Sequence, residues 1–150
     1  MLPTRSTTRH QLIVVLAIIA SLLGVLTAKA DMVTEWNIRD CEIVTAAGLE
    51  TPQANRVMAI AHTAAYQAAN AITHRYPASG AKIKPETGAS IEAAITAAHR
   101  TALMQLVPLQ GSAIESAYQA ALGKIADGPA KSAGIRVGEM AAKTVLAERI

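Results

Sequence analysis

The side chains best suited to chemistry lie in one alanine-rich stretch, residues 51–74. His62, Tyr66 and Asn70 recur there at intervals of four residues, so on a helix they follow one side, with a drift of about 40° per step. An imidazole, a phenol and an amide at this spacing can hydrogen-bond to one another or to nearby backbone. Because buried polar groups need partners, we predict a buried, mutually bonded polar seam with a structural role. Contact with a ligand is the alternative.

These residues do not indicate a metal site. A helical zinc pair needs two histidines four residues apart and an acidic ligand, and His62 is followed at that distance by Tyr66. His99 and Arg100 lie within another apolar stretch, and we interpret them as a core or interface histidine and a solvated arginine. The chain also lacks a paired-carboxylate motif and a nucleophile elbow. We therefore predict no catalytic, cofactor-binding or metal-binding residue.

The stretch 51–74 is expected to form the central helix. Thr51 can cap the first free amide groups, and Pro52 suits the first helical position. Apolar residues cover most of the circumference beyond them. A helix of this kind needs neighbours on several sides.

Four further helices are predicted around it. The periodicity of apolar residues indicates helices over 31–48, 90–107, 112–125 and from 129 toward 150. Asp31 is an expected N-cap, and Ser112 with Glu115 has the spacing of a capping box. Trp36 is expected to anchor the first helix to the central one, with its indole N–H on an acceptor. The predicted fold class is therefore all-α, a bundle of about five helices.

Two other features complete the predicted bundle. In the last helix, Gly134 and Gly138 begin a stripe of small residues that favours close packing against another helix. Residues 75–89, rich in Pro, Gly, Ser and Lys, are expected to form an exposed crossover loop. Lys82 and Lys84 in this loop could contact an anion, but no glycine-rich phosphate cradle surrounds them.

The first thirty residues are predicted to be a signal peptide. Basic residues precede an unbroken apolar run over 12–26, and the sequence AKA at 28–30 places small residues where a signal peptidase inspects the chain. We expect cleavage before Asp31 and a periplasmic or secreted product; an uncleaved membrane anchor is the alternative. Arg5, Arg9 and Lys29 account for the formal charge of +3. The remainder is balanced in charge, which argues against a nucleic-acid partner.

Four motifs occur in an order that resembles a known family. They are VTEWN at 33–37, ANRVMAIAHTAAYQAANAI at 54–72, AAHRTAL at 97–103 and IADGPAKSAGIRVGEMAA at 125–142. Together they resemble the N-terminal helical region of secreted bacterial proteins similar to vanadium-dependent haloperoxidases, within the phosphatidic acid phosphatase type 2 superfamily. The resemblance covers most of residues 31–150 and implies an all-helical fold.

The resemblance also implies where catalysis would occur. In that family a vanadate or phosphate oxyanion is bound, in the C-terminal half, by a Lys and an Arg-Pro element, a Pro-Ser-Gly-His element, and an Arg and a His of a third element. This chain has no Arg-Pro pair, and Ser79-Gly80 is followed by Ala81. Vanadate or phosphate is thus implied only for a full-length relative.

The expected function follows from that difference. We expect residues 31–150 to be the helical N-terminal region of a haloperoxidase- or phosphatase-like protein, with the catalytic half absent and no activity alone. The expected partners are the missing C-terminal catalytic region or a second copy of the chain. The alternative is a self-sufficient secreted helical bundle that acts as a partner-binding module.

Overall fold

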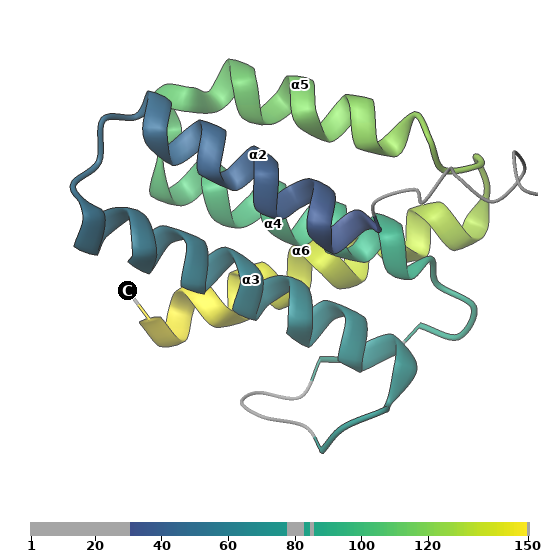
Figure 1. Cartoon of the computed structure of the whole chain (residues 1–150). Helices are drawn as coiled ribbons and strands as arrows, with labels where there is room; N and C mark the ends of the chain where they lie inside the picture. The colour runs from purple at the N-terminus through teal and green to yellow at the C-terminus, as the bar shows by residue number, and fades with distance from the viewer. Residues whose placement is uncertain (1–30, 78–82, 85, 150) are drawn as a thin grey trace, which may run out of the picture. The chain divides into compact units, whose positions relative to one another are not determined.

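The computed structural model describes residues 31–149 except 78–82 and 85, and this part of the chain is helical throughout its regular structure (Figure 1). The helices are α2 (Met32–Ala46), α3 (Thr51–Thr73), α4 (Ile91–Leu106), α5 (Gly111–Leu122) and α6 (Pro129–Arg149), with a short 3-10 helix, η1 (Pro108–Gln110), before α5. The predicted all-α bundle of about five helices is confirmed. The predicted signal peptide and Lys82 lie outside the described residues. Among the described helices, none combines the length and apolar character needed to cross a bilayer.

Several helix ends form as the sequence predicts. The Asp31 side chain caps α2 by accepting a hydrogen bond from the backbone N–H of Thr34, at 2.8 Å. The chain then turns at Gly48, whose φ of +64° is one that glycine adopts without a steric penalty. Pro129 is the first residue of α6, where its missing N–H leaves no hydrogen bond unmade.

Two predicted caps are wrong. Thr51 is already inside α3, and the N-cap is Glu50, whose side chain makes no capping hydrogen bond. Ser112 lies inside α5 because η1 leads directly into that helix, which starts at Gly111 and has Gln110 as its N-cap. The capping box therefore does not form.

The central helix is α4, not α3. It packs against each of the other four helices, and nine of its 16 residues are buried. Figure 1 shows α4 between α5 on one side and α3 and α6 on the other. The reason is side-chain size: alanines on several sides of α4 have no exposed surface, so neighbouring helices approach it from every direction. They are Ala93, Ala94, Ala97, Ala98 and Ala102.

The contact between α4 and α6 depends on glycine. A Cβ placed on Gly134 would lie 2.3 Å from the carbonyl oxygen of Ser90, and one on Gly138 would lie 2.1 Å from that of Ala94. Both distances are far below van der Waals contact, so only glycine fits at this separation of the helices. The predicted close-packing stripe is confirmed, and its partner is α4.

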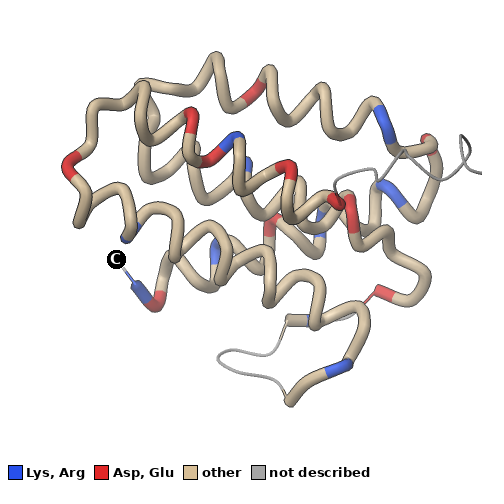
Figure 2. The backbone as a smooth tube through the Cα atoms, in the orientation of Figure 1, with Lys and Arg blue, Asp and Glu red and all other residues tan. Residues whose placement is uncertain are grey.

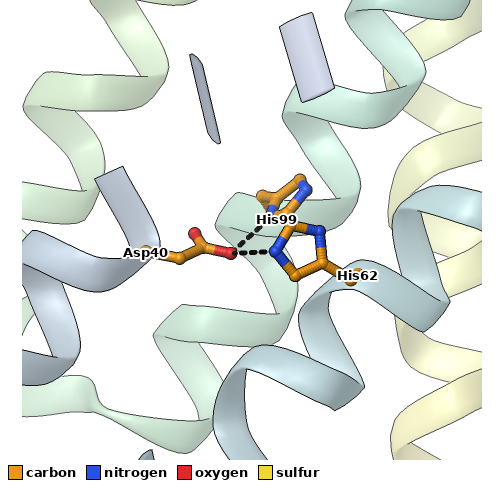
Figure 3. A group of neighbouring side chains, drawn as sticks. All are labelled: Asp40, His62 and His99. Carbon is orange, nitrogen blue, oxygen red and sulfur yellow. Dashed lines mark ion pairs between the residues drawn. The ribbon is translucent and has the colours of Figure 1, made fainter. Parts of the chain in front are cut away.

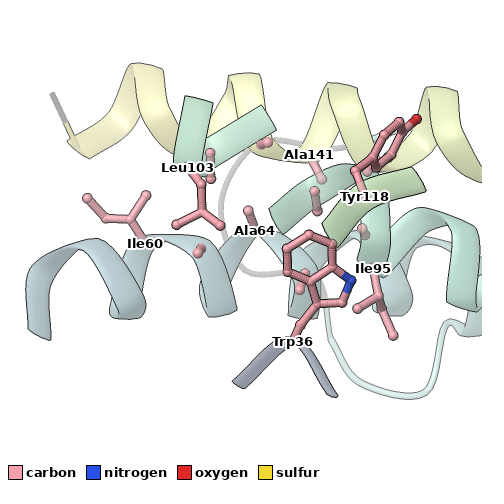
Figure 4. Close-up of a cluster of buried hydrophobic side chains, with 14 of the residues drawn as sticks. Trp36, Ile60, Ala64, Ile95, Leu103, Tyr118 and Ala141 are labelled. Carbon is pink, nitrogen blue, oxygen red and sulfur yellow. The ribbon is translucent and has the colours of Figure 1, made fainter. Parts of the chain in front are cut away.

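A continuous core of aliphatic and alanine side chains joins the helices (Figure 4). Trp36 of α2 is its largest member and is 1% exposed. Its indole Nε1–H donates to Oγ1 of Thr96 at 3.3 Å, so the predicted anchor with a bonded N–H is present. The acceptor belongs to α4 and not to the helix predicted as central, while Figure 4 shows Trp36 next to Ala64 of α3 as well as Ile95 of α4.

Candidate functional site

Three ionisable side chains from three helices meet inside the bundle. Asp40 belongs to α2, His62 to α3 and His99 to α4, and Figure 3 shows their side chains pointing toward one another. Oδ2 of Asp40 lies 2.9 Å from Nδ1 of His99 and 3.6 Å from Nε2 of His62. Asp40 and His99 are completely buried, whereas the His62 side chain is 31% exposed. Of the three side chains only His62 reaches solvent, and its Nε2 atom is itself buried.

The three side chains are close together but are not satisfied by hydrogen bonds. The 2.9 Å approach of His99 to Asp40 is short enough for a hydrogen bond but lacks the required alignment, so it is a close contact without a hydrogen bond. Within the described residues, both carboxylate oxygens of Asp40, Nε2 of His62 and both ring nitrogens of His99 are buried without a hydrogen-bond partner. Buried polar atoms are rarely left in this state, so the cluster calls for an explanation.

Aromatic contacts fix the plane of the central imidazole. The Trp36 ring stacks on His99, with the ring centroids 5.0 Å apart and the planes 8° from parallel. His62 approaches His99 edge-on, also at 5.0 Å, with the planes at 85°. The hydrogen bond to Thr96 holds the Trp36 ring in place. The fixed Trp36 ring in turn sets the orientation of the His99 ring that stacks on it.

Electrostatics favour a neutral His62. Burial lowers the pKa of His62, and the neighbouring His99 lowers it further, while the Asp40 carboxylate acts in the opposite direction. With its pKa lowered from an ordinary value that is already below neutrality, the imidazole of His62 is mostly neutral at pH 7. A neutral imidazole offers a lone pair on one ring nitrogen, and Nε2 is the nitrogen nearest Asp40.

The predicted seam of His62, Tyr66 and Asn70 does not form as a single network. Tyr66 is 44% exposed and lies beside the ring of Tyr76. Asn70 donates from Nδ2 to the carbonyl oxygen of Tyr76 at 3.0 Å and accepts from the Tyr76 N–H at 2.9 Å, so it holds the chain after the C-terminus of α3. The drift of about 40° per step moves these side chains around the helix, and only His62 faces the interior cluster. The prediction of three buried, mutually bonded side chains is therefore wrong.

The sequence prediction overlooked Asp40. Its position in the sequence indicates burial, because Asp40 lies four residues after Trp36 and three before Ile43, both of which are buried on α2. A carboxylate on the apolar face of a helix needs a partner inside the core. The prediction of a core histidine at position 99 is confirmed. We predicted no metal ligands because we looked for ligand pairs at helical spacing within one helix. The fold instead brings three side chains of ligand type together from separate helices.

Arg100 is not the solvated residue that the sequence predicted. Its Nε donates to Oε2 of Glu115 on α5 at 2.8 Å, and its guanidinium lies 4.9 Å from the centroid of the Tyr118 ring. The hydrogen bond from Arg100 to Glu115 raises the pKa of the guanidinium. Hydrogen bonds from Gln119 and from Arg100 lower the pKa of the Glu115 carboxyl. This group joins α4 to α5.

Other basic side chains are paired separately with acidic ones. In the described ranges, four further ion pairs join Arg39 to Glu42, Lys124 to Glu35, Lys131 to Asp127 and Arg136 to Glu86. Figure 2 shows positive and negative residues interspersed along the helices. Lys84, singled out in the sequence, lines a surface hollow together with Glu86 and Arg136. The ion-paired cations therefore lie at separate places in the bundle, whereas Arg56 and Arg149 line one hollow together.

Comparisons with protein-family models, with curated proteins and with solved structures found no match to this chain. The interpretation of the site therefore rests on its own geometry. That geometry supplies two imidazoles and one carboxylate, which can bind a metal ion or exchange protons. It supplies no gathering of positive charge suited to a phosphate-like anion.

Proposed function

We propose that this chain is the helical, non-catalytic part of an exported protein that resembles vanadium-dependent haloperoxidases and type 2 phosphatidic acid phosphatases. The observation that carries the proposal is the arrangement of the cations. Five basic side chains each lie against their own carboxylate, at separate places in the bundle. A vanadate or phosphate ion needs several donors that converge in a preorganised, dry pocket.

The placement of the four motifs supports the same proposal. Their distinctive residues lie at contacts between helices: Trp36 and His99 stack on each other, His62 meets His99, and Gly134 and Gly138 allow α6 to pack on α4. Residues used in this way specify how a helical scaffold packs. They do not by themselves transform a substrate.

The proposal predicts that the chain alone neither binds vanadate, nor oxidises halide, nor hydrolyses phosphoesters. Purified protein would be titrated with vanadate by calorimetry, then assayed for bromide oxidation with peroxide and for turnover of a chromogenic phosphate. We expect no signal above heat-inactivated protein. Micromolar vanadate binding, or activity above that control, would contradict the proposal. The first residues to mutate would then be His62, His99 and Arg100.

The proposed partner is a C-terminal catalytic region or a second copy of the chain. Reading the DNA downstream of the Ile150 codon in all frames tests the first. We expect coding sequence for the Arg-Pro, Pro-Ser-Gly-His and third oxyanion-binding elements of the resembled family. Unrelated sequence after a clean stop would favour the alternative function, a self-sufficient bundle that binds a partner. Sedimentation of the purified protein over a range of concentrations tests self-association.

A further inference from the structure

We propose that Asp40, His62 and His99 form a binding site for a divalent transition-metal ion of the zinc type. The inference is independent of the function proposed above, because it concerns the interior of the helical bundle and requires no oxyanion. It starts from the three side chains, whose candidate ligand atoms all lie within 4.8 Å of one another. These atoms are Oδ2 of Asp40, Nε2 of His62 and Nδ1 of His99.

The spacing of these atoms suits a zinc-sized ion. With zinc–nitrogen and zinc–oxygen bonds of about 2.0–2.2 Å, two ligand atoms of a tetrahedral site lie about 3.3–3.6 Å apart. The Asp40–His62 contact of 3.6 Å lies at the upper end of that range, and the Asp40–His99 contact of 2.9 Å lies below it. Because the candidate ligand atoms all lie within 4.8 Å of one another, side-chain rotations would bring all three to the spacing of one ion.

The lack of hydrogen bonds among these side chains indicates that they bind one metal ion in common. The His99 nitrogen lies beside the Asp40 oxygen but is not aligned with it, and Nε2 of His62 has no other partner among the described residues. Ligands of one metal ion have this relation, because each directs its lone pair at the ion and not at its neighbour. An ion bound by Oδ2, Nε2 and Nδ1 would satisfy three buried polar atoms at once.

The ligand types select the class of ion. Two imidazole nitrogens and one carboxylate suit zinc and neighbouring first-row metals, whereas magnesium and calcium prefer oxygen ligands alone. Asp40 and His99 are fully buried and His62 is partly exposed, so an ion would enter on the side of His62. Zinc sites with three protein ligands commonly take water as the fourth ligand. Trp36 acts as a positioning residue because its stacking fixes the plane of His99.

Metal titration of the untagged full chain tests the proposal. After treatment with a chelator, the protein would be titrated with Zn²⁺ against a competing indicator and separately with Co²⁺, whose visible absorption reports its coordination. We expect one ion per chain, a higher melting temperature with Zn²⁺, and an absorption typical of cobalt with mixed nitrogen and oxygen ligands. Magnesium should not compete.

Three variants show whether the bound ion lies in this cluster. His62→Ala changes the partly exposed ligand, which makes it the variant least disruptive to the core, and Asp40→Asn removes the anionic one. Each should weaken Zn²⁺ binding by at least about 100-fold, the upper end of the loss seen when only an outer-sphere partner is removed. His74→Ala is the matched control, because His74 is an exposed histidine outside the cluster, and it should bind Zn²⁺ as the unmodified chain does.

Several outcomes would overturn the proposal. They are the absence of stoichiometric Zn²⁺ binding, binding that persists unchanged in both His62→Ala and Asp40→Asn, and binding that His74→Ala abolishes. Circular dichroism of each variant shows whether it retains its helices. If Asp40→Asn unfolds, the comparison of His62→Ala with His74→Ala still decides the matter. The results of the vanadate-binding and activity assays have no bearing on these outcomes, so this proposal and the proposed function fail separately.

Discussion

Replacing Gly138 by alanine should destabilise the protein, although alanine is the better helix former. Gly138 lies in α6 where this helix crosses α4, and an added Cβ would lie 2.1 Å from the carbonyl oxygen of Ala94 and 2.9 Å from Cβ of Ala97. Ordinary van der Waals contact begins at 3.4 Å. Neither neighbouring atom can rotate away, because one belongs to the backbone and the other is fixed to it.

The expected magnitude follows from two opposing effects. Alanine gains about 1 kcal/mol over glycine in a helix interior. Overpacking a filled core costs about 1–3 kcal/mol, and the upper end applies here because the two helices must separate by more than 1 Å along their contact. We therefore expect a net loss of about 2 kcal/mol in the free energy of unfolding. For a domain of this size the melting temperature should fall by about 8 °C.

Thermal and urea unfolding, followed by circular dichroism, measure this loss. Gly111→Ala is the matched control: Gly111 has helical backbone angles, and its added Cβ would meet only the Met104 side chain, at ordinary distances of 3.7 Å to Sδ and 3.9 Å to Cε. This control should be neutral or more stable than the parent. The reasoning is refuted if Gly138→Ala is as stable as the parent, or if both variants lose stability equally.

Three further predictions concern single contacts. His74 ends α3 with a left-handed φ of 50°, so His74→Gly should raise stability by about 0.5–1 kcal/mol in urea unfolding; a loss would mean that the His74 side chain makes a contact worth more than this strain. Thr96→Val leaves the buried Trp36 N–H without its acceptor and should cost about 1–3 kcal/mol, whereas Thr96→Ser should cost less, and equal losses would show that the hydrogen bond is unimportant. Because hydrogen bonds from Gln119 and Arg100 lower the pKa of Glu115 in the folded protein, these contacts stabilise the fold above the ordinary carboxyl pKa, and this stabilisation is lost as the pH falls through the lower folded value. The stability difference between the parent and Glu115→Gln should therefore shrink below about pH 4.5, and a difference that stays constant would contradict this assignment.

The features predictable from the sequence are those that depend on neighbouring residues. Apolar periodicity located the helices, and Asp31 and Pro129 marked two of their starts, because a cap or a first-turn proline acts within one turn of the chain. The predicted capping box at Ser112 does not form because the start of this helix depends on the residues before it. The sequence showed a competent local motif but not that η1 would lead directly into the helix one residue earlier.

The periodicity of apolar residues does not show which of the helices is central. Both α3 and α4 are alanine-rich, but α4 is buried on several sides and α3 retains an exposed side at Tyr66. Glycine decides the difference, because Gly134 and Gly138 bring α6 against α4 at a distance that no other residue permits. Small residues on one helix can be read from the sequence, whereas the helix that receives them is fixed only by the assembled bundle.

The Asp40, His62 and His99 cluster shows the same limit for a site. Its members lie on three helices, so no spacing along the chain links them, and a search for ligand pairs on one helix finds only His62 followed by Tyr66. What could be read locally is that each lies among apolar residues, where an ionisable group is costly unless it has a partner. Three such groups buried in one small bundle are therefore expected to contact one another. A polar residue on the apolar face of each of several predicted helices is therefore a better sign of a composite site than any spacing within one helix.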